Sequence, residues 1–181
     1  MVTIELIQQT NILLATTSLI LGVFGVLLFI DLRTKQNFRV IIEKVGMHGA
    51  LFLTFFATLL TLLYSEVFGL VPCGFCWLER MMLWTQVPLV LTALYFKERF
   101  MPRHGIVLSW IGLVISLYHH YIQMGGSSFI ACPSSGGDCA KRFMFEFGFV
   151  TFPLLAAILF AFLVVWYTYI LKTRTNTHPT T

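Results

Sequence analysis

Five stretches of the 181-residue sequence are each long enough and apolar enough to cross a lipid bilayer as a helix. A helix rises about 1.5 Å per residue, so about 20 residues span a hydrocarbon core roughly 30 Å thick. The stretches cover residues 11–30, 46–65, 73–96, 105–124 and 148–171. Only 11% of all residues are charged, whereas soluble domains carry about 25%. The sequence therefore predicts an all-α integral membrane protein.

The first apolar stretch is expected to remain in the protein as a transmembrane helix. A cleaved signal peptide begins with basic residues and ends in small ones. Residues 1–10 contain no Lys or Arg, and residues 27–31 offer no small side chain. In the third stretch, Pro88 predicts a kink, which a helical bundle tolerates.

The basic residues predict the orientation of the chain in the membrane. With five spans, the connectors at 31–45 and 97–104 share one side with the tail at 172–181. That side carries most of the basic residues: Arg33, Lys35, Arg39, Lys44, Lys97, Arg99, Arg103, Lys172 and Arg174. The positive-inside rule places this side, including a disordered tail, in the cytoplasm and the N-terminus and all cysteines outside. The net charge of +4 thus reflects topology in a lipid environment and indicates no nucleic-acid partner.

Cys73 and Cys76 stand at the start of the third stretch, separated by two residues. At a helix N-terminus, unpaired N–H groups and the helix dipole stabilise a thiolate, which favours a reactive pair. A static disulfide, two reduced thiols and a zinc site are the alternatives. The spacing of the other two cysteines is unlike that of a zinc knuckle, so we expect no metal.

Cys132 and Cys139 lie in the polar segment at 125–147, predicted to be on the same side of the membrane. Their bridge either staples the loop or acts as a shuttle disulfide. An exposed bridge in a short Gly/Ser/Pro-rich loop is accessible to an attacking thiolate. The presence of a second pair at the same surface favours the shuttle.

Several polar residues near the cysteines are candidates for a cofactor site. Glu79 and Arg80 follow the first pair, and Arg80 lies one helical turn beyond Cys76 on the same face. Arg80 is expected to stabilise a thiolate at Cys76 or the negative oxygen of a reduced aromatic cofactor; the alternative is an interfacial ion pair or a lipid headgroup contact. His119 and His120 end the fourth stretch, at the opposite membrane face from His48, which disfavours a bis-histidine haem site.

Two motifs resemble the DsbB/BdbC family of membrane thiol–disulfide oxidoreductases. They are Pro72-Cys-Gly-Phe-Cys-Trp-Leu-Glu-Arg80 and Gly137-Asp-Cys-Ala140. The resemblance implies a four-helix transmembrane bundle at 46–171, with an extracytoplasmic loop at 125–147, in a bacterial plasma membrane. It also implies a bound quinone, either ubiquinone or menaquinone, and a soluble thioredoxin-like (DsbA-like) dithiol partner.

The resemblance assigns roles to the cysteines and their neighbours. Cys132 would be attacked by the partner's thiolate, with Cys139 as its disulfide mate, and the Cys73–Cys76 disulfide would reoxidise that pair. Cys76 would pass the electrons to the quinone. The quinone-binding residues would be Arg80, Glu79, Cys76 and His120, the histidine that matches the family position better.

Residues 1–45, with the extra N-terminal helix, lie outside the family's four-helix core and have no role there beyond anchoring or partner contact. Two alternatives remain. A vitamin K epoxide reductase-like enzyme also combines a bundle, a C-x-x-C pair and a loop pair, but there the helix-start pair follows the loop pair in sequence. A membrane anchor with purely structural disulfides is the non-enzymatic alternative.

Overall fold

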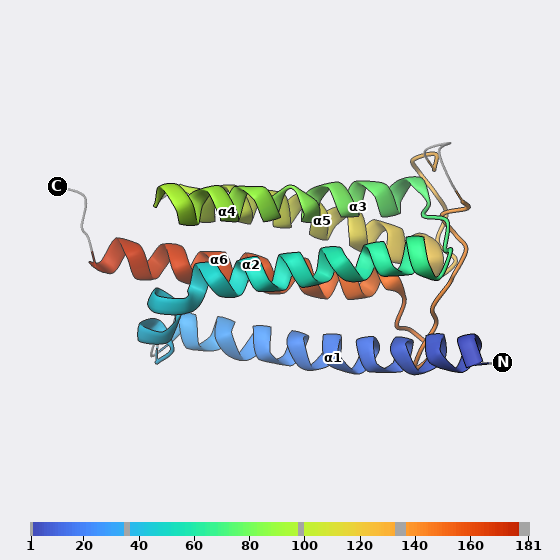
Figure 1. The fold of residues 1–181 in the computed structure, drawn as a ribbon, viewed down its shortest axis with the longest axis horizontal. Helices are drawn as coiled ribbons and strands as arrows, with labels where there is room; N and C mark the ends of the chain where they lie inside the picture. Colours follow the sequence, from blue (N-terminus) through green and yellow to red (C-terminus); the bar gives the residue numbers. More distant parts are fainter. Residues whose placement is uncertain (1, 35–36, 98–99, 133–136, 178–181) are drawn as a thin grey trace.

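The computed structural model describes residues 2–34, 37–97, 100–132 and 137–177. Every regular element in these ranges is a helix: α1 (Val2–Arg33), α2 (Arg39–Leu62), the π-helix η1 (Leu63–Val67), α3 (Gly74–Trp84), α4 (Gln86–Phe96), α5 (Met101–Gln123) and α6 (Phe152–Thr177). The helices lie side by side in one bundle (Figure 1). The predicted all-α membrane fold is confirmed.

The two ends of the bundle carry different connections (Figure 1). The N-terminus, the α2–α3 connection and the α5–α6 segment lie at one end, which we call the cysteine end because residues 73, 76, 132 and 139 are there. The α1–α2 turn, the α4–α5 turn and the C-terminal end of α6 lie at the opposite end. Of the basic connector residues, Lys35 and Arg99 lie outside the described residues.

Within the described residues, four helices are individually long and apolar enough to span a membrane: Glu5–Arg33, Arg39–Val67, Met101–Gln123 and Phe152–Arg174. The predicted third span is instead divided into α3 and α4, each of 11 residues. The two lie end to end in Figure 1, with the helix interrupted at Thr85. Pro88 explains the position of the break, because it has no N–H to donate to the Trp84 carbonyl and its ring crowds that carbonyl.

Two polar segments are more helical than the sequence predicted. Much of the connector at 31–45 is helical, since α1 continues to Arg33 and α2 begins at Arg39; the Asp31 carboxylate accepts the N–H groups of Asn37 (3.1 Å) and Phe38 (3.4 Å) just before α2. The expected disorder of the tail is wrong for residues 172–177, which continue α6. Lys172 Nζ donates to the Leu32 carbonyl at 2.7 Å, and Thr173 is buried, so α1 holds this part of the tail. Residues 178–181 lie outside the described residues.

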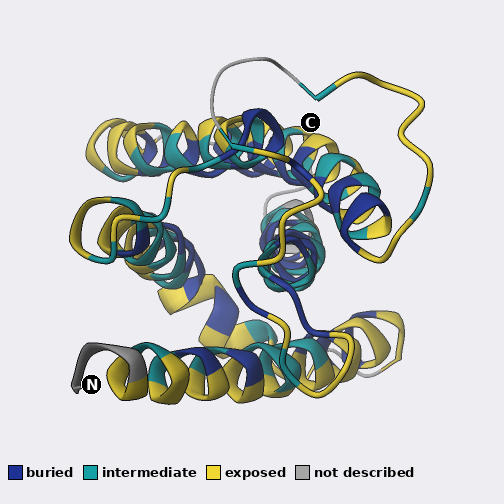
Figure 2. Ribbon diagram, turned by 90° about the vertical axis from the view of Figure 1, so that its right-hand side faces the viewer, coloured by how far each residue is buried: buried dark blue, intermediate teal, exposed yellow. Residues whose placement is uncertain are grey.

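α6 is the central helix of the bundle and contacts α1, α2 and α5. Two glycines let α5 approach it closely: a Cβ at Gly105 would lie 2.6 Å from the Tyr167 ring, and one at Gly112 would lie 2.5 Å from the Phe160 ring. Both rings are fully buried. Figure 2, viewed from the cysteine end, shows exposed residues mainly on the outward faces of the helices. That arrangement suits a bundle whose outer surface meets lipid.

Candidate functional site

Cys73 forms the N-cap of α3. Its backbone is extended (φ −76°, ψ 172°), and its Sγ accepts the N–H of Cys76 at 3.3 Å. The N–H of Trp77 bonds to the Cys73 carbonyl at 3.1 Å, which starts the helix. The N–H of Cys76, one of the first-turn groups that have no partner within the helix, therefore points toward the Cys73 sulfur. This arrangement stabilises a thiolate at Cys73, one member of the pair for which the helix N-terminus predicted a reactive thiol.

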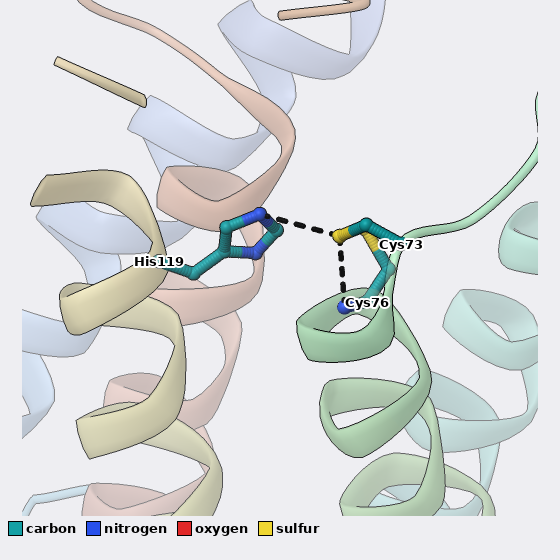
Figure 3. A group of neighbouring side chains, drawn as sticks. All are labelled: Cys73, Cys76 and His119. Atoms are coloured by element: carbon teal, nitrogen blue, oxygen red, sulfur yellow. Dashed lines mark hydrogen bonds between the residues drawn. The ribbon is translucent and has the colours of Figure 1, made fainter. Parts of the chain in front are cut away.

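The two cysteines of α3 are present as free thiols. Their sulfurs lie 2.8 Å apart (Figure 3). Cys73 is buried, and Cys76 is partly buried. The pair is therefore placed to interconvert between a dithiol and a disulfide by thiol–disulfide exchange.

His119 of α5 is fully buried and faces Cys73 (Figure 3). Its Nε2 lies 3.5 Å from the Cys73 sulfur, and its Nδ1 lies 2.9 Å from Oε1 of Glu79 on α3. In the tautomer that carries its proton on Nδ1, His119 donates to the Glu79 carboxylate and Nε2 can take a proton from Cys73; the charged imidazolium can return it. Cys73, His119 and Glu79 thus form one continuous chain of polar contacts, the geometry that an acid–base relay requires.

His120, the histidine favoured by the family resemblance, points elsewhere. Its Nδ1 lies 2.8 Å from the hydroxyl of Thr151, the residue that precedes α6. The register of α5 explains the difference. The buried stripe of this helix repeats every three or four residues, as a packed helical face does, and runs through Gly105, Ser109, Gly112, Ser116 and His119. That spacing was available in the sequence and selects His119.

The loop disulfide joins Cys132 and Cys139, with the Cα atoms 6.1 Å apart. The loop docks directly on the start of α3: Gly137 forms a backbone bridge with Cys73, and the Cys139 carbonyl lies 3.2 Å from Nε2 of His119. Cys73 and Cys139 are buried in one packed cluster, and Cys76 and Cys132 pack against it. The structure therefore brings both predicted pairs together in one cluster at the cysteine end.

Arg80 is held by the last turn of α2 and by η1, which follows it. Its Nη2 donates to the Thr61 carbonyl at 2.9 Å, its Nη1 donates to the Ser65 hydroxyl at 3.3 Å, and its guanidinium lies over the Trp77 ring at 5.6 Å. Ser65 belongs to the π-helix η1, a distortion that frequently marks functional sites. These bonds fix the position of the positive charge on the side of α3 that faces α2.

A cavity of about 460 Å³ extends from this charge into the bundle. Its walls come from α1, α2, η1, α3 and α6 and are mostly hydrophobic, whereas Cys76, Glu79 and Arg80 supply polar groups from α3. The lining residues of α3 run from Cys76 to Leu83, which is two helical turns, or about 10 Å. His120 is not among the lining residues.

The site also contains a potential metal-ligand trio. The donor atoms of Cys73, Cys76 and His119 all lie within 4.8 Å of one another. A structural zinc site needs four ligands. Cys132 and Cys139, which could supply a fourth ligand, are bonded to each other. The donor set therefore suits thiol exchange better than a closed zinc site.

Comparisons with known proteins identify disulfide formation proteins as relatives of this chain. A model of the family described as disulfide bond formation protein DsbB matches residues 44–170. SPbeta prophage-derived disulfide bond formation protein B of Bacillus subtilis is 36% identical over 110 residues, which make up 61% of this chain and 74% of the relative. Probable disulfide formation protein C 1 of Bacillus anthracis is 32% identical over 122 residues, or 67% of this chain and 88% of the relative.

No solved structure matches the chain significantly. The family match covers more than half of the sequence, and it includes both cysteine pairs and most of each candidate membrane span that follows α1 among the described residues. This multi-pass membrane protein therefore belongs to the DsbB family of disulfide-generating oxidoreductases.

Proposed function

We propose that this protein reoxidises a soluble thioredoxin-like dithiol partner and passes the two electrons to a quinone in the membrane. The observation that carries the proposal is the shared cysteine cluster, in which the loop pair packs on Cys73 and Cys76 lines the apolar cavity. The cysteines thus connect an exposed loop to a site inside the bundle. Family membership disfavours the vitamin K epoxide reductase-like alternative.

The first exchange takes place at the loop. Cys132 is partly exposed, whereas only 2% of Cys139 is accessible, so the partner's thiolate attacks the Cys132 sulfur. Cys139 leaves as a thiolate, and a mixed disulfide forms between the partner and Cys132. The partner's second thiol then attacks its own mixed-disulfide sulfur, so the partner leaves oxidised and the loop holds two thiols.

The second exchange returns the loop to its disulfide. The Cys139 thiolate attacks the Cys73 sulfur of the Cys73–Cys76 disulfide, and Cys76 leaves as a thiolate beside the cavity. Cys132 then attacks Cys139, which re-forms the loop disulfide and releases Cys73 next to His119. The arrangement in the structure, with the loop pair oxidised and the α3 pair reduced, corresponds to the end of this step.

The relay of His119 and Glu79 supplies the proton transfers. When the α3 pair becomes a disulfide again, Cys73 must lose its proton, and Nε2 of His119 accepts it. Nδ1 of His119 then delivers a proton to the carboxylate of Glu79, which lines the cavity. Glu79 thereby carries protons from the buried sulfur to the site where electrons leave.

The cavity fits a quinone, because one part of its lining is polar and the rest is apolar, as are the ring and tail of such a molecule. Cys76, Glu79 and Arg80 would hold the ring. When bound, a quinone accepts two electrons and two protons. The fixed guanidinium of Arg80 favours negative charge on a group in this cavity, including the Cys76 thiolate. His120 contacts Thr151 instead and is left out of the proposed site.

The proposed location is a bacterial plasma membrane, with the cysteine end extracytoplasmic. The described basic residues of the connectors and of the end of α6 gather at the opposite end of the bundle: Arg33, Arg39, Lys44, Lys97, Arg103, Lys172 and Arg174. The positive-inside rule places such an end in the cytoplasm. The cysteine end then faces the oxidising compartment, where disulfides persist.

Purified protein in detergent tests the function as a whole. With a reduced thioredoxin-like partner and a soluble quinone, we expect one quinone to be reduced for each partner disulfide formed, as measured by quinone absorbance and a thiol count. Without the protein, or with the partner already oxidised, the quinone should stay oxidised. Disulfides that are only structural would give no quinone reduction under any of these conditions.

Replacement of His119 by Gln is expected to slow quinone reduction by about 10²- to 10³-fold, because the Cys73 proton loses its acceptor. Gln can still donate to Glu79, so the carboxylate keeps a partner. Rapid mixing of the reduced variant with quinone measures the rate. His120→Gln is the matched control and should stay within about twofold of the wild type, since it contacts Thr151. A larger defect in His120→Gln than in His119→Gln would contradict the relay.

A further inference from the structure

The extra helix α1 contributes a wall to the cavity beside the cysteines. α1 ends at Arg33, before the segment that the family model matches. Nevertheless, a stripe of its residues at helical spacing lines the cavity: Leu14, Thr17, Ser18, Leu21 and Phe24. A helix that served only as an anchor would have no need to face this site.

Polar contacts hold α1 in place at both ends. At the cysteine end, the hydroxyl of Tyr64 donates to Oδ1 of Asn11 at 2.7 Å, and both residues are buried. At the opposite end, the hydroxyl of Tyr169 donates to the Asp31 carboxylate at 2.7 Å. In a hydrocarbon environment no water competes for these groups, so such bonds fix one helix against another.

Tyr64 also connects α1 to the start of α6. Its ring packs edge-on against Phe152 with the ring centroids 4.8 Å apart, and both side chains line the cavity. Asn11, Tyr64 and Phe152 therefore join α1, η1 and α6 where the cavity approaches the cysteine end.

Deeper in the bundle, the cavity opens to the outer surface between α1 and α2. Phe24 of α1 and Phe56 of α2 line it, yet 40% and 49% of their surfaces are exposed. Ile20 of α1 lines it as well and is 65% exposed. This outer face meets lipid in a membrane, so the opening leads into the bilayer, where quinones with long apolar tails are dissolved.

We propose that α1 forms the binding surface for the isoprenoid tail of the quinone and, with α2, frames its lateral entry from the bilayer. The inference rests on the proposed function and adds a substrate-binding role for a helix outside the family core. The ring end of the site, at Cys76, Glu79 and Arg80, does not depend on α1. Changes in α1 should therefore affect quinones with a tail and spare tailless ones.

Two variants of α1 separate the cavity face from the lipid face. Leu21→Trp places a large ring in the cavity, whereas Val23→Trp places the same ring on an outward face that is 63% exposed and does not line the cavity. We expect Leu21→Trp to raise the KM for a long-tailed quinone by about tenfold or more and to leave the KM for a tailless quinone within about twofold. Val23→Trp should change neither KM.

A second variant and a folding check keep the test decisive. Ser18→Phe fills the same cavity from one turn earlier and should reproduce the selective rise in KM. Exchange of the loop disulfide with a reduced partner, measured without quinone, reports that each variant is folded. If the wild type reduces quinone but both cavity variants bind long-tailed quinone as well as Val23→Trp does, the tail site is refuted. If the wild type reduces no quinone, the proposed function itself fails.

Discussion

Replacement of Cys76 by Ser is expected to abolish quinone reduction by a reduced partner, with a loss on the order of 10³-fold or more, as removal of a reacting nucleophile does in other enzymes. Cys76 is the cysteine of the α3 pair that lines the cavity, and no other described cysteine does. A serine oxygen can neither form a disulfide with Cys73 nor donate electrons to a quinone in the cavity. Quinone absorbance after rapid mixing with reduced partner measures the loss.

The first exchange should survive in this variant, which distinguishes a chemical defect from misfolding. The loop disulfide remains and can still be reduced once by the partner, so one partner disulfide per chain should appear without any reduced quinone. Met81→Ser is the control, since Met81 lies on α3 one turn further along and is 54% exposed. It should turn over at nearly the wild-type rate. Normal quinone reduction by Cys76→Ser would refute the electron path.

The gross architecture followed from the sequence because lipid imposes one strong requirement. A segment in hydrocarbon must satisfy its own backbone, so apolar runs of about 20 residues have to become helices. The third run forms two helices, α3 and α4, because Pro88 leaves the Trp84 carbonyl without its helical hydrogen bond. Charge bias and cysteine spacing also placed both pairs at one end, where the structure brings them into one cluster.

The site itself depended on contacts between distant segments, which spacing alone does not reveal. Arg80 lies one turn beyond Cys76, yet its hydrogen bonds go to Thr61 of α2 and Ser65 of η1, which precede α3 in the sequence. The place of α1 as a cavity wall rests on contacts between distant segments, among them the Asn11–Tyr64 bond across 53 residues of sequence and the Asp31–Tyr169 bond. The sequence could have identified His119, because the repeat of small residues along α5 that marks the buried face includes His119 and not His120.

The loop cysteine that meets the partner is expected to be Cys132. Two single-cysteine variants test this, both built with Cys73 and Cys76 replaced by Ser: Cys139→Ala retains Cys132, and Cys132→Ala retains Cys139. The probe is a partner whose one attacking cysteine carries thionitrobenzoate. A thiolate of the membrane protein displaces that group, which forms the mixed disulfide and releases a coloured thiol without any added oxidant.

We expect the variant that retains Cys132 to capture about one partner per chain and to react at least about tenfold faster than the variant that retains Cys139, since a buried thiol is shielded from attack. Only 2% of Cys139 is accessible, and its carbonyl lies 3.2 Å from Nε2 of His119, on the inner side of the loop. Faster capture at Cys139 would reverse the order of the two exchanges, and no capture at either position would leave the loop bridge as a staple. Because a protein partner cannot cross a bilayer, the same reaction on intact spheroplasts also reports sidedness: capture from outside requires the cysteine end to be extracytoplasmic.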